Sequence, residues 1–150
     1  MTRVRIEQEA PLPEACDTID LEFLLDSVLE DHCAEGTVTL VLARDATLRR
    51  LNGQFKGAFV PTDVLSFDLA DPVHPDCEDL GEIYISVDRA ALQAREGSRC
   101  VSEELAWLAI HGTLHLLGYR HDCARSGASM RRKEREYLAR HHAGIHMKGV

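Results

Sequence analysis

Three histidines lie close together in the segment HGTLHLLGYRHD, at His111, His115 and His121. Residues four apart lie one turn above the other on a helix, so His111 and His115 can present two imidazoles to one ion. Gly118 stands where a helix can end in a left-handed turn, after which the chain can reverse and deliver His121. Three nitrogen ligands leave one position of a tetrahedral zinc open for water, the pattern of catalytic sites. The spacing therefore predicts a metal-dependent hydrolase.

The same segment has the spacing of the metzincin motif HExxHxxGxxH, except that Gly112 stands in place of the glutamate. That glutamate takes a proton from the zinc-bound water in those proteases, so its absence argues against peptide hydrolysis but leaves the metal ligands intact. Glycine inside a helix costs about 1 kcal/mol relative to alanine. We therefore expect a neighbouring strand or a substrate backbone to approach closely at Gly112. Cys123 is an alternative sulfur ligand, although an inert thiol is the favoured interpretation.

Composition limits the class of protein. With 150 residues, 45% hydrophobic and 28% charged, the chain suits one soluble globular domain over residues 1–150. The first thirty residues carry charges throughout and lack the apolar core of a signal peptide, and no apolar run is long enough to span a bilayer. The five cysteines are odd in number and never spaced as CxxC, which favours reduced thiols and a cytoplasmic location.

The formal net charge of −8 argues against nucleic acid as a partner, but the charge is unevenly distributed. Residues 120–150 hold eight Lys or Arg against three acids, whereas residues 1–119 hold nine against twenty-two. The basic residues therefore gather beside the histidine segment, where they can contact phosphates. A solvated helix face with chance clustering is the alternative explanation.

Hydrophobic periodicity predicts the elements that must position these histidines. Alternating or β-branched runs indicate strands at residues 4–8, 37–43, 63–70 and 81–87. Helices are expected at residues 20–34, from Asp45 as a cap into a short helix, at 88–97, from Ser102 through the histidines, and at 128–142. Two glycines and a proline predict a loop at residues 52–61. Because strands come first and helices dominate the end, the pattern predicts a single α+β domain.

The histidine segment also resembles the signature of a known family, the bacterial rRNA maturation factors and endoribonucleases called YbeY. The family signature HGxLHLxGYDH is similar to HGTLHLLGYRH at residues 111–121. A second family block, LNxxYRGKDxPTDVLSF, resembles LNGQFKGAFVPTDVLSF at residues 51–67, and a third, LGDIxIS, resembles LGEIYIS at residues 80–86. The resemblance runs from about residue 43 to residue 138, with the blocks in family order.

This resemblance implies a fold, a metal and an activity. The implied fold is compact α+β, with a small mixed sheet packed against helices and a zincin-like helix that holds the metal. The implied zinc ligands are His111, His115 and His121, although imidazoles also accept nickel, cobalt or iron. The implied activity is hydrolysis of single-stranded RNA, in maturing the 3′ end of small-subunit (16S) rRNA and in ribosome quality control. The expected partners are therefore rRNA and the small ribosomal subunit or its proteins.

The chain departs from the family pattern at two places. Arg120 replaces the usual Asp before the third histidine, and Asp122 either substitutes for it or leaves its role unfilled. Lys56 aligns with the Arg of YRGK; a lysine meets a phosphate as a point charge but cannot form the bidentate fork, so weaker phosphate binding is expected. Within the matched PTDVLSF block, Thr62 and Asp63 are candidates either for function or only for starting the strand.

The expected mechanism uses the metal and the basic residues. Zinc would lower the pKa of a bound water or polarise a phosphoryl oxygen, and Lys56 would steady the scissile phosphate. Arg120, Arg125 and the basic cluster at residues 131–135 would follow the RNA backbone. No general base is assigned; Glu82 is a weak candidate beside the simpler interpretation of a solvated strand residue.

Two other functions remain open at this point. One is a ribosome-assembly factor that binds RNA or a ribosomal protein and uses the metal only to hold its fold. The other is a metal-dependent protease, which Gly112 makes the weakest of the three.

Overall fold

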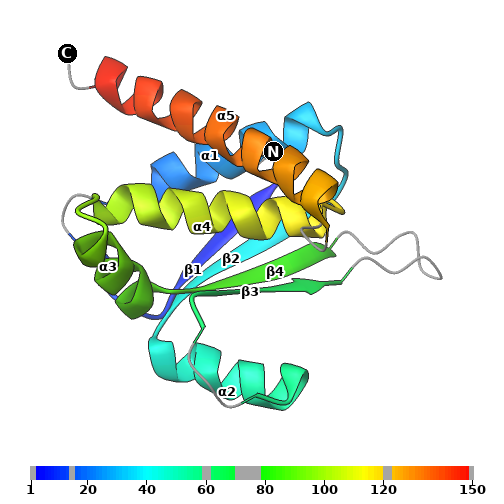
Figure 1. The fold of residues 1–150 in the computed structure, drawn as a ribbon, viewed down its shortest axis with the longest axis vertical. Helices are drawn as coiled ribbons and strands as arrows, with labels where there is room; N and C mark the ends of the chain where they lie inside the picture. Colours follow the sequence, from blue (N-terminus) through cyan, green and yellow to red (C-terminus); the bar gives the residue numbers. More distant parts are fainter. Residues whose placement is uncertain (1–2, 14–15, 59–61, 70–78, 120–122, 149–150) are drawn as a thin grey trace.

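The computed structural model describes residues 3–13, 16–58, 62–69, 79–119 and 123–148, with the backbone alone for residues 142–148. Within these ranges the chain forms a four-stranded mixed sheet and five helices (Figure 1). The predicted α+β class is therefore confirmed.

The sheet has three parallel strands and one antiparallel strand at its edge. The strands are β1 (Val4–Gln8), β2 (Thr37–Ala43), β3 (Val64–Asp68) and β4 (Asp79–Ser86). In the order β1-β2-β4-β3, the first three strands are parallel neighbours, and β3 pairs antiparallel with β4. β2 lies inside the sheet and is covered on both faces, which explains why its sequence TVTLVLA is an almost continuous apolar run.

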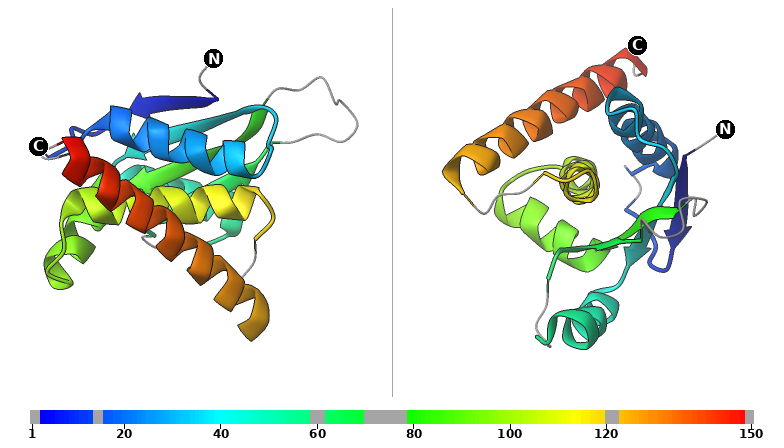
Figure 2. Two further views of the ribbon diagram at one scale, coloured as in Figure 1. Left: turned by 90° about the horizontal axis from the view of Figure 1, so that it is seen from above. Right: turned by 90° about the vertical axis from the view of Figure 1, so that its right-hand side faces the viewer.

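The helices cover the two faces of the sheet unequally. They are α1 (Thr18–Asp31), α2 (Asp45–Lys56), α3 (Val87–Glu96), α4 (Val101–Leu116) and α5 (Ala124–Lys148). α1, α4 and α5 stack on one face, and α2 lies alone on the other (Figure 1). Viewed end-on, α4 runs through the middle of the molecule with α1, α5 and the sheet around it (Figure 2). The larger core lies around α4, and a smaller core lies beneath α2.

The end of α2 differs from the sequence prediction. The helix continues to Lys56, so the loop expected at residues 52–61 is wrong in its first half; residues 59–61 lie outside the described part of the chain. Asn52 and Gly53 remain helical because they continue the buried face of α2. The helix ends at Gly57, which has the left-handed φ of 75° that glycine adopts without strain.

Two predicted helix starts are also corrected. Asp45 is the first helical residue of α2 and not its cap, and its carboxylate accepts hydrogen bonds from Ser86 and Arg89 at the start of α3. α4 begins at Val101, one residue before the start expected at Ser102, and its N-cap residue is Cys100. In both helices the N-cap residue, Arg44 or Cys100, makes no side-chain capping hydrogen bond, so the polar side chains that the prediction used do not mark the start.

α5 is longer at both ends than the predicted range of 128–142. The apolar periodicity that the prediction used lies only in the middle of this helix. Met130, Tyr137 and Leu138 form the packing side as expected, and the first two are 1% exposed.

Two compositional expectations can be compared with the described residues. The four cysteines among them are not joined to one another by disulfides. None of the described helices is both long and apolar enough to cross a membrane.

Candidate metal centre

The central helix α4 is fixed on the sheet by contacts on several sides. Helices α1, α3 and α5 and strands β3 and β4 all pack against it. Its buried residues are Glu104, Leu105, Ala106, Leu108, Ala109, Ile110, Gly112, Thr113 and Leu114. His111 and His115 lie half-buried on the remaining side, toward the N-terminal half of α5. A helix packed in this way holds both imidazoles on a rigid element.

The two histidines of α4 converge as the four-residue spacing predicts. The Nε2 atoms of His111 and His115 are 3.2 Å apart, and the two rings meet edge to face with centroids 4.6 Å apart. In a tetrahedral zinc site with Zn–N distances of about 2.0–2.1 Å, two ligand nitrogens lie about 3.3–3.4 Å from each other. The separation of the Nε2 atoms therefore fits two ligands of one ion.

A buried carboxylate on α5, which the sequence analysis missed, fixes the ring of His111. Glu134 is 5% exposed, and its Oε1 lies 2.6 Å from Nδ1 of His111. Its other oxygen, Oε2, accepts a hydrogen bond of 3.1 Å from the indole of Trp107, whose ring also lies against His111. Each carboxylate oxygen thus has one donor, so the orientation of Glu134 is itself fixed.

This contact decides which nitrogen of His111 can bind a metal. A carboxylate accepts hydrogen bonds, so the proton of the neutral imidazole is on Nδ1, and the lone pair is on Nε2. Nε2 is the atom that faces His115. A carboxylate on the outer nitrogen of a ligating histidine is the usual support of metal-binding imidazoles in proteins. The residues present therefore fit a transition metal such as zinc.

Gly112 is explained by the close approach of two strands. A Cβ atom at this position would lie 2.7 Å from Cγ2 of Ile83 and 3.0 Å from Oγ of Ser66. Ser66 also donates a hydrogen bond of 3.1 Å to the carbonyl of Gly112. The predicted reason for a glycine between the two histidines is therefore confirmed, and the approaching groups are side chains of β3 and β4.

The chain leaves α4 through a glycine turn of the predicted kind. Gly118 has a φ of 98°, its N–H bonds the carbonyl of His115, and the N–H of Tyr119 bonds the carbonyl of Leu114. These two bonds form a Schellman motif, which reverses the chain direction after a helix. Tyr119 is then tied to α1, because its hydroxyl lies 2.9 Å from Nε2 of His32. Nδ1 of His32 bonds the Val28 carbonyl, so Nε2 accepts from the tyrosine.

His121, the third predicted ligand, lies outside the described residues, as does Arg120. Among the residues that the structure does describe, no group of three or more His, Cys, Asp or Glu could hold a metal ion. The described part of the centre is thus the pair His111 and His115 with Glu134 behind it. Cys123, the alternative ligand, is exposed, and its Sγ lies 3.1 Å from Oγ of Ser126.

The other predicted site residues are not gathered around the histidine pair. Lys56 is exposed at the end of α2, on the opposite face of the sheet from α4 (Figure 1). Glu82 faces the α2 side as well, where its carboxylate accepts a hydrogen bond of 2.6 Å from Tyr84. This bond and burial raise the pKa of Tyr84 to about 12. Asp63 holds the start of β3, because its backbone carbonyl accepts from Ser86 and its carboxylate from Gln93.

The basic cluster of α5 lies on the outer side of that helix. Arg125, Arg131, Arg132 and Arg135 are exposed, and Lys133 forms an ion pair of 3.5 Å with Glu136. The inner side carries Met130 and Glu134. The cations therefore point to solvent from the same half of α5 that supplies the carboxylate to His111.

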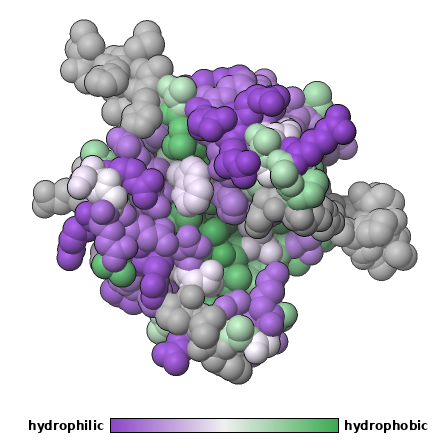
Figure 3. Space-filling model, viewed as in Figure 1, coloured by the Kyte–Doolittle hydropathy of each residue, from purple (hydrophilic) through white to green (hydrophobic). Residues whose placement is uncertain are grey.

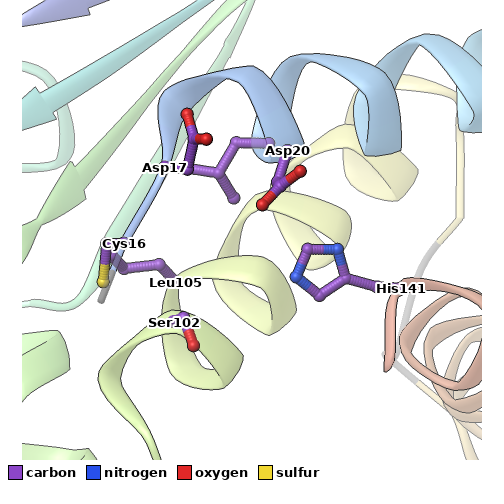
Figure 4. A pocket seen from close by; sticks show the side chains of 7 residues that line it. Cys16, Asp17, Asp20, Ser102, Leu105 and His141 are labelled. Atoms are coloured by element: carbon purple, nitrogen blue, oxygen red, sulfur yellow. The ribbon is translucent and has the colours of Figure 1, made fainter. Parts of the chain in front are cut away.

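A separate pocket lies near the other end of α5 (Figure 4). It has a volume of about 250 Å³ and lies between the start of α1, the first turns of α4 and His141. Its lining residues are Cys16, Asp17, Asp20, Leu21, Ser102, Leu105 and His141. Asp17 serves as the N-cap of α1, accepting a hydrogen bond of 2.8 Å from the N–H of Ile19. Burial and the neighbouring Cys100 raise the pKa of the Cys16 thiol, so it is a weak nucleophile.

Known proteins are similar to this chain over most of its length. A family model described as Endoribonuclease YbeY matches residues 7–142. A curated protein named Endoribonuclease YbeY from Moorella thermoacetica is 39% identical over 143 residues, which are 88% of this chain and 92% of that protein. Another of that name from Pelotomaculum thermopropionicum is 43% identical over 115 residues, covering 74% of this chain and 76% of the relative.

A solved structure shares the fold over almost the whole length of both chains. It is the solution structure of TM1509 from Thermotoga maritima, with a TM-score of 0.69 and 28% sequence identity. The match covers 97% of this chain and 93% of the other.

Proposed function

The chain belongs to the endoribonuclease YbeY family of metal-dependent hydrolases, and from this premise we propose that it is a zinc enzyme that cleaves single-stranded RNA. Its proposed biological role is maturation of the 3′ end of small-subunit (16S) rRNA and ribosome quality control. The observation that carries the chemistry is the convergence of His111 and His115 with the buried Glu134 on the outer nitrogen of His111.

The proposed zinc ligands are His111, His115 and His121. When bound, zinc supplies Lewis acidity, which polarises a phosphoryl oxygen and makes water a stronger nucleophile at neutral pH. Glu134, held by Trp107, would keep the lone pair of His111 directed toward the ion. The packing of α4 on β3 and β4 would keep the two imidazoles at a constant separation. Glu134 is engaged by both donors, so its role is to orient His111 and not to touch the substrate.

The proposed substrate contacts use the cations at the surface. Exposed arginines on the N-terminal half of α5 lie on the element that also holds Glu134, so they can bind phosphates that flank the scissile bond. Lys56 can bind a phosphate on the other side of the edge strand as a point charge. RNA binding by a chain with a net charge of −8 would use the uneven distribution of its charges, because residues 120–150 hold eight Lys or Arg against three acids.

The test is cleavage of single-stranded RNA by protein that was purified without a histidine tag and analysed for bound metal. We expect about one zinc per chain, cleavage of single-stranded but not of fully paired RNA, and trimming of small subunits that carry an unprocessed 3′ end. His115→Ala should remain folded, lose the zinc and lose cleavage by roughly 10³-fold or more, since the metal contributes several kcal/mol to the transition state.

A histidine from the pocket near the other end of α5 provides the matched control. His141 is half-buried like His115, and His141→Ala should retain both zinc and cleavage. Undiminished cleavage by folded His115→Ala would show that the nuclease is a contaminant. A folded zinc-bound protein without turnover on any single-stranded RNA would reject the enzymatic proposal as well.

A further inference from the structure

Three aromatic rings form a row on the face of the sheet that carries α2. Phe55 comes from the last turn of α2, Phe67 from the edge strand β3, and Tyr84 from β4. The rings of Phe55 and Phe67 meet edge to face with centroids 5.3 Å apart, and those of Phe67 and Tyr84 do so at 5.8 Å. Aromatic pairs favour this edge-to-face geometry, so the row holds itself together across three elements.

The outer member of the row is open to solvent, although its helix is anchored on the sheet. The side of α2 that packs on the sheet is anchored by the buried residues Leu48 and Leu51. Phe55 on the same helix is 64% exposed. Its ring contacts the ring of Phe67, and most of the residue is exposed. A large apolar side chain held in this way offers a flat contact surface at little entropic cost.

The row lies across the edge strand from the histidine pair. Ser66 of β3 bonds the carbonyl of Gly112, between the two histidines, while the next residue, Phe67, points to the opposite face of the sheet. The C-terminal ends of α2 and α4 lie toward the same end of the sheet (Figure 1). In the space-filling view from the same side, hydrophobic side chains gather in the middle of the face, where α4 meets the strands (Figure 3). A strand of RNA that crosses the edge at β3 can therefore contact both places.

The charges around the row have opposite signs on its two sides. Lys56 directly follows Phe55, and Arg49 and Arg50 are exposed earlier on α2. On the strand side, Glu82 is paired in register with Phe67, and Asp68 follows it in β3. A phosphate is attracted to the helix side and repelled from the strand side. The row itself is apolar, so it suits an uncharged flat group whose backbone passes along α2.

We propose that Phe55 and Phe67 form a stacking platform for an unpaired base of the RNA substrate, on a nucleotide neighbouring the scissile phosphate. This inference rests on the proposed function, because it deepens how that centre binds its substrate. Base–aromatic stacking is a common means of holding single strands, and it needs the base to be unpaired. The platform therefore gives the enzyme a physical reason to select single-stranded over double-stranded RNA.

The test is binding of a short single-stranded RNA by metal-free protein, followed by fluorescence anisotropy so that no turnover interferes. Phe55→Ala should weaken binding about tenfold, the loss expected for one stacked base. Phe55→Trp should restore it. Lys56→Gln should instead lower the salt dependence of binding by about one phosphate contact, whereas Phe55→Ala should leave that slope unchanged. A 2-aminopurine base in the RNA should be quenched by the wild type and not by Phe55→Ala.

The matched control is Phe23 on α1, which is 65% exposed and lies far from the row in the sequence. Phe23→Ala should bind RNA as the wild type does, which excludes a general effect of removing an exposed ring. Removing the stacked base from the RNA should abolish the difference between wild type and Phe55→Ala.

Three outcomes would overturn the platform and leave the nuclease proposal standing. The first is binding by Phe55→Ala within twofold of the wild type. The second is an equal loss of affinity with RNA that lacks the base. The third is a change of oligomeric state in Phe55→Ala without a change in RNA affinity, which would assign the row to a second copy of the chain. Failure of the wild type to bind or cleave any RNA would reject the nuclease proposal itself.

Discussion

Each half of α5 faces a cluster of side chains of metal-ligating types, but the two clusters are arranged differently. In the N-terminal half, Glu134 meets His111, and the Nε2 atoms of His111 and His115 are 3.2 Å apart. Toward the other end, His141 lines a pocket together with Cys16, Asp17 and Asp20 (Figure 4). All of these residue types can ligate a metal. Only the first place, however, brings two nitrogens to the separation that one ion requires.

The difference lies in how the side chains are supported. His111 and His115 project from consecutive turns of one rigid helix, and Glu134 fixes the first ring from behind. The pocket draws its polar residues from three elements, and Asp17 is already used to cap α1. A metal centre therefore depends on common support and an outer hydrogen bond more than on the kinds of residue that lie nearby.

The contrast between the two halves of α5 depends first on whether Glu134 is needed for metal binding. In Glu134→Gln, one carboxylate oxygen becomes an NH₂ group, which cannot accept from either Trp107 or His111. One of the two donors then faces another donor, and the ring of His111 is no longer fixed. We expect the affinity for zinc to fall roughly 10- to 100-fold, as for other outer carboxylates of metal-bound histidines. Competition with a chromogenic chelator measures this loss without an activity assay.

Glu136 supplies the control for this substitution. It lies two residues away on the same helix and pairs with Lys133 and Arg140 at the surface. Glu136→Gln should bind zinc as tightly as the wild type. If both variants bind zinc equally well, the buried carboxylate of Glu134 is not what makes the N-terminal half of α5 suitable for a metal centre.

Gly112→Ala tests whether the close packing of α4 on the sheet requires a glycine between the two histidines. In Gly112→Ala the new methyl would contact Ile83, which is fully buried. Overpacking of this kind costs about 1–3 kcal/mol, and the better helix propensity of alanine returns about 1 kcal/mol. We expect a net loss of at most about 2 kcal/mol in the free energy of unfolding, measured by urea denaturation.

A double-mutant cycle identifies the cause of that loss. Ile83→Ala creates space beside residue 112, so adding Gly112→Ala in this background should be neutral or slightly stabilising. An equal cost of Gly112→Ala in both backgrounds would mean that contact with Ile83 is not the reason for the glycine.

Local spacing predicted the part of the site that lies on one element. The i, i+4 rule places His111 beside His115 whatever surrounds the helix, and the Schellman turn at Gly118 is also a local motif. Glu134 was missed because it meets His111 across 23 residues of chain. A signal was present: on α5 it shares the buried face of Met130 and Tyr137, and an acid on a buried helix face must have a partner. The bond between His32 and Tyr119 spans 87 residues and had no such signal.

Strands β1 and β2 were predicted more accurately than the end of α2 for a similar reason. Alternation or a continuous apolar run defines a strand such as β2 almost to the residue. The end of α2 depended instead on whether Asn52 and Gly53 would be buried, which is decided by the packing of α2 on the sheet and not by the residues themselves.

The smallest expected effect concerns the anchor between α5 and the end of α1. Asp31 accepts hydrogen bonds from Arg140 at 2.7 Å and from Tyr137 at 2.9 Å. The Arg140 guanidinium first, and then the Tyr137 hydroxyl, hold the pKa of Asp31 below its ordinary value. The folded chain therefore binds this proton less tightly than the unfolded chain. The stabilisation is complete above the ordinary Asp pKa of about 3.9 and is lost as the pH falls through the lower folded value.

Asp31→Asn should accordingly reduce the free energy of unfolding at pH 7 by less than about 1 kcal/mol, because the pair is largely exposed. Urea unfolding at pH 7 and at pH 3 measures how this difference shrinks as the wild-type carboxylate becomes protonated. A difference that is the same at both pH values would show that ionisation of Asp31 contributes nothing. Zinc affinity should not change in this variant, since the anchor holds α5 without contacting His111 or Glu134. A loss of zinc would instead mean that the position of α5 as a whole, and not the local bond of Glu134, orients the metal ligands.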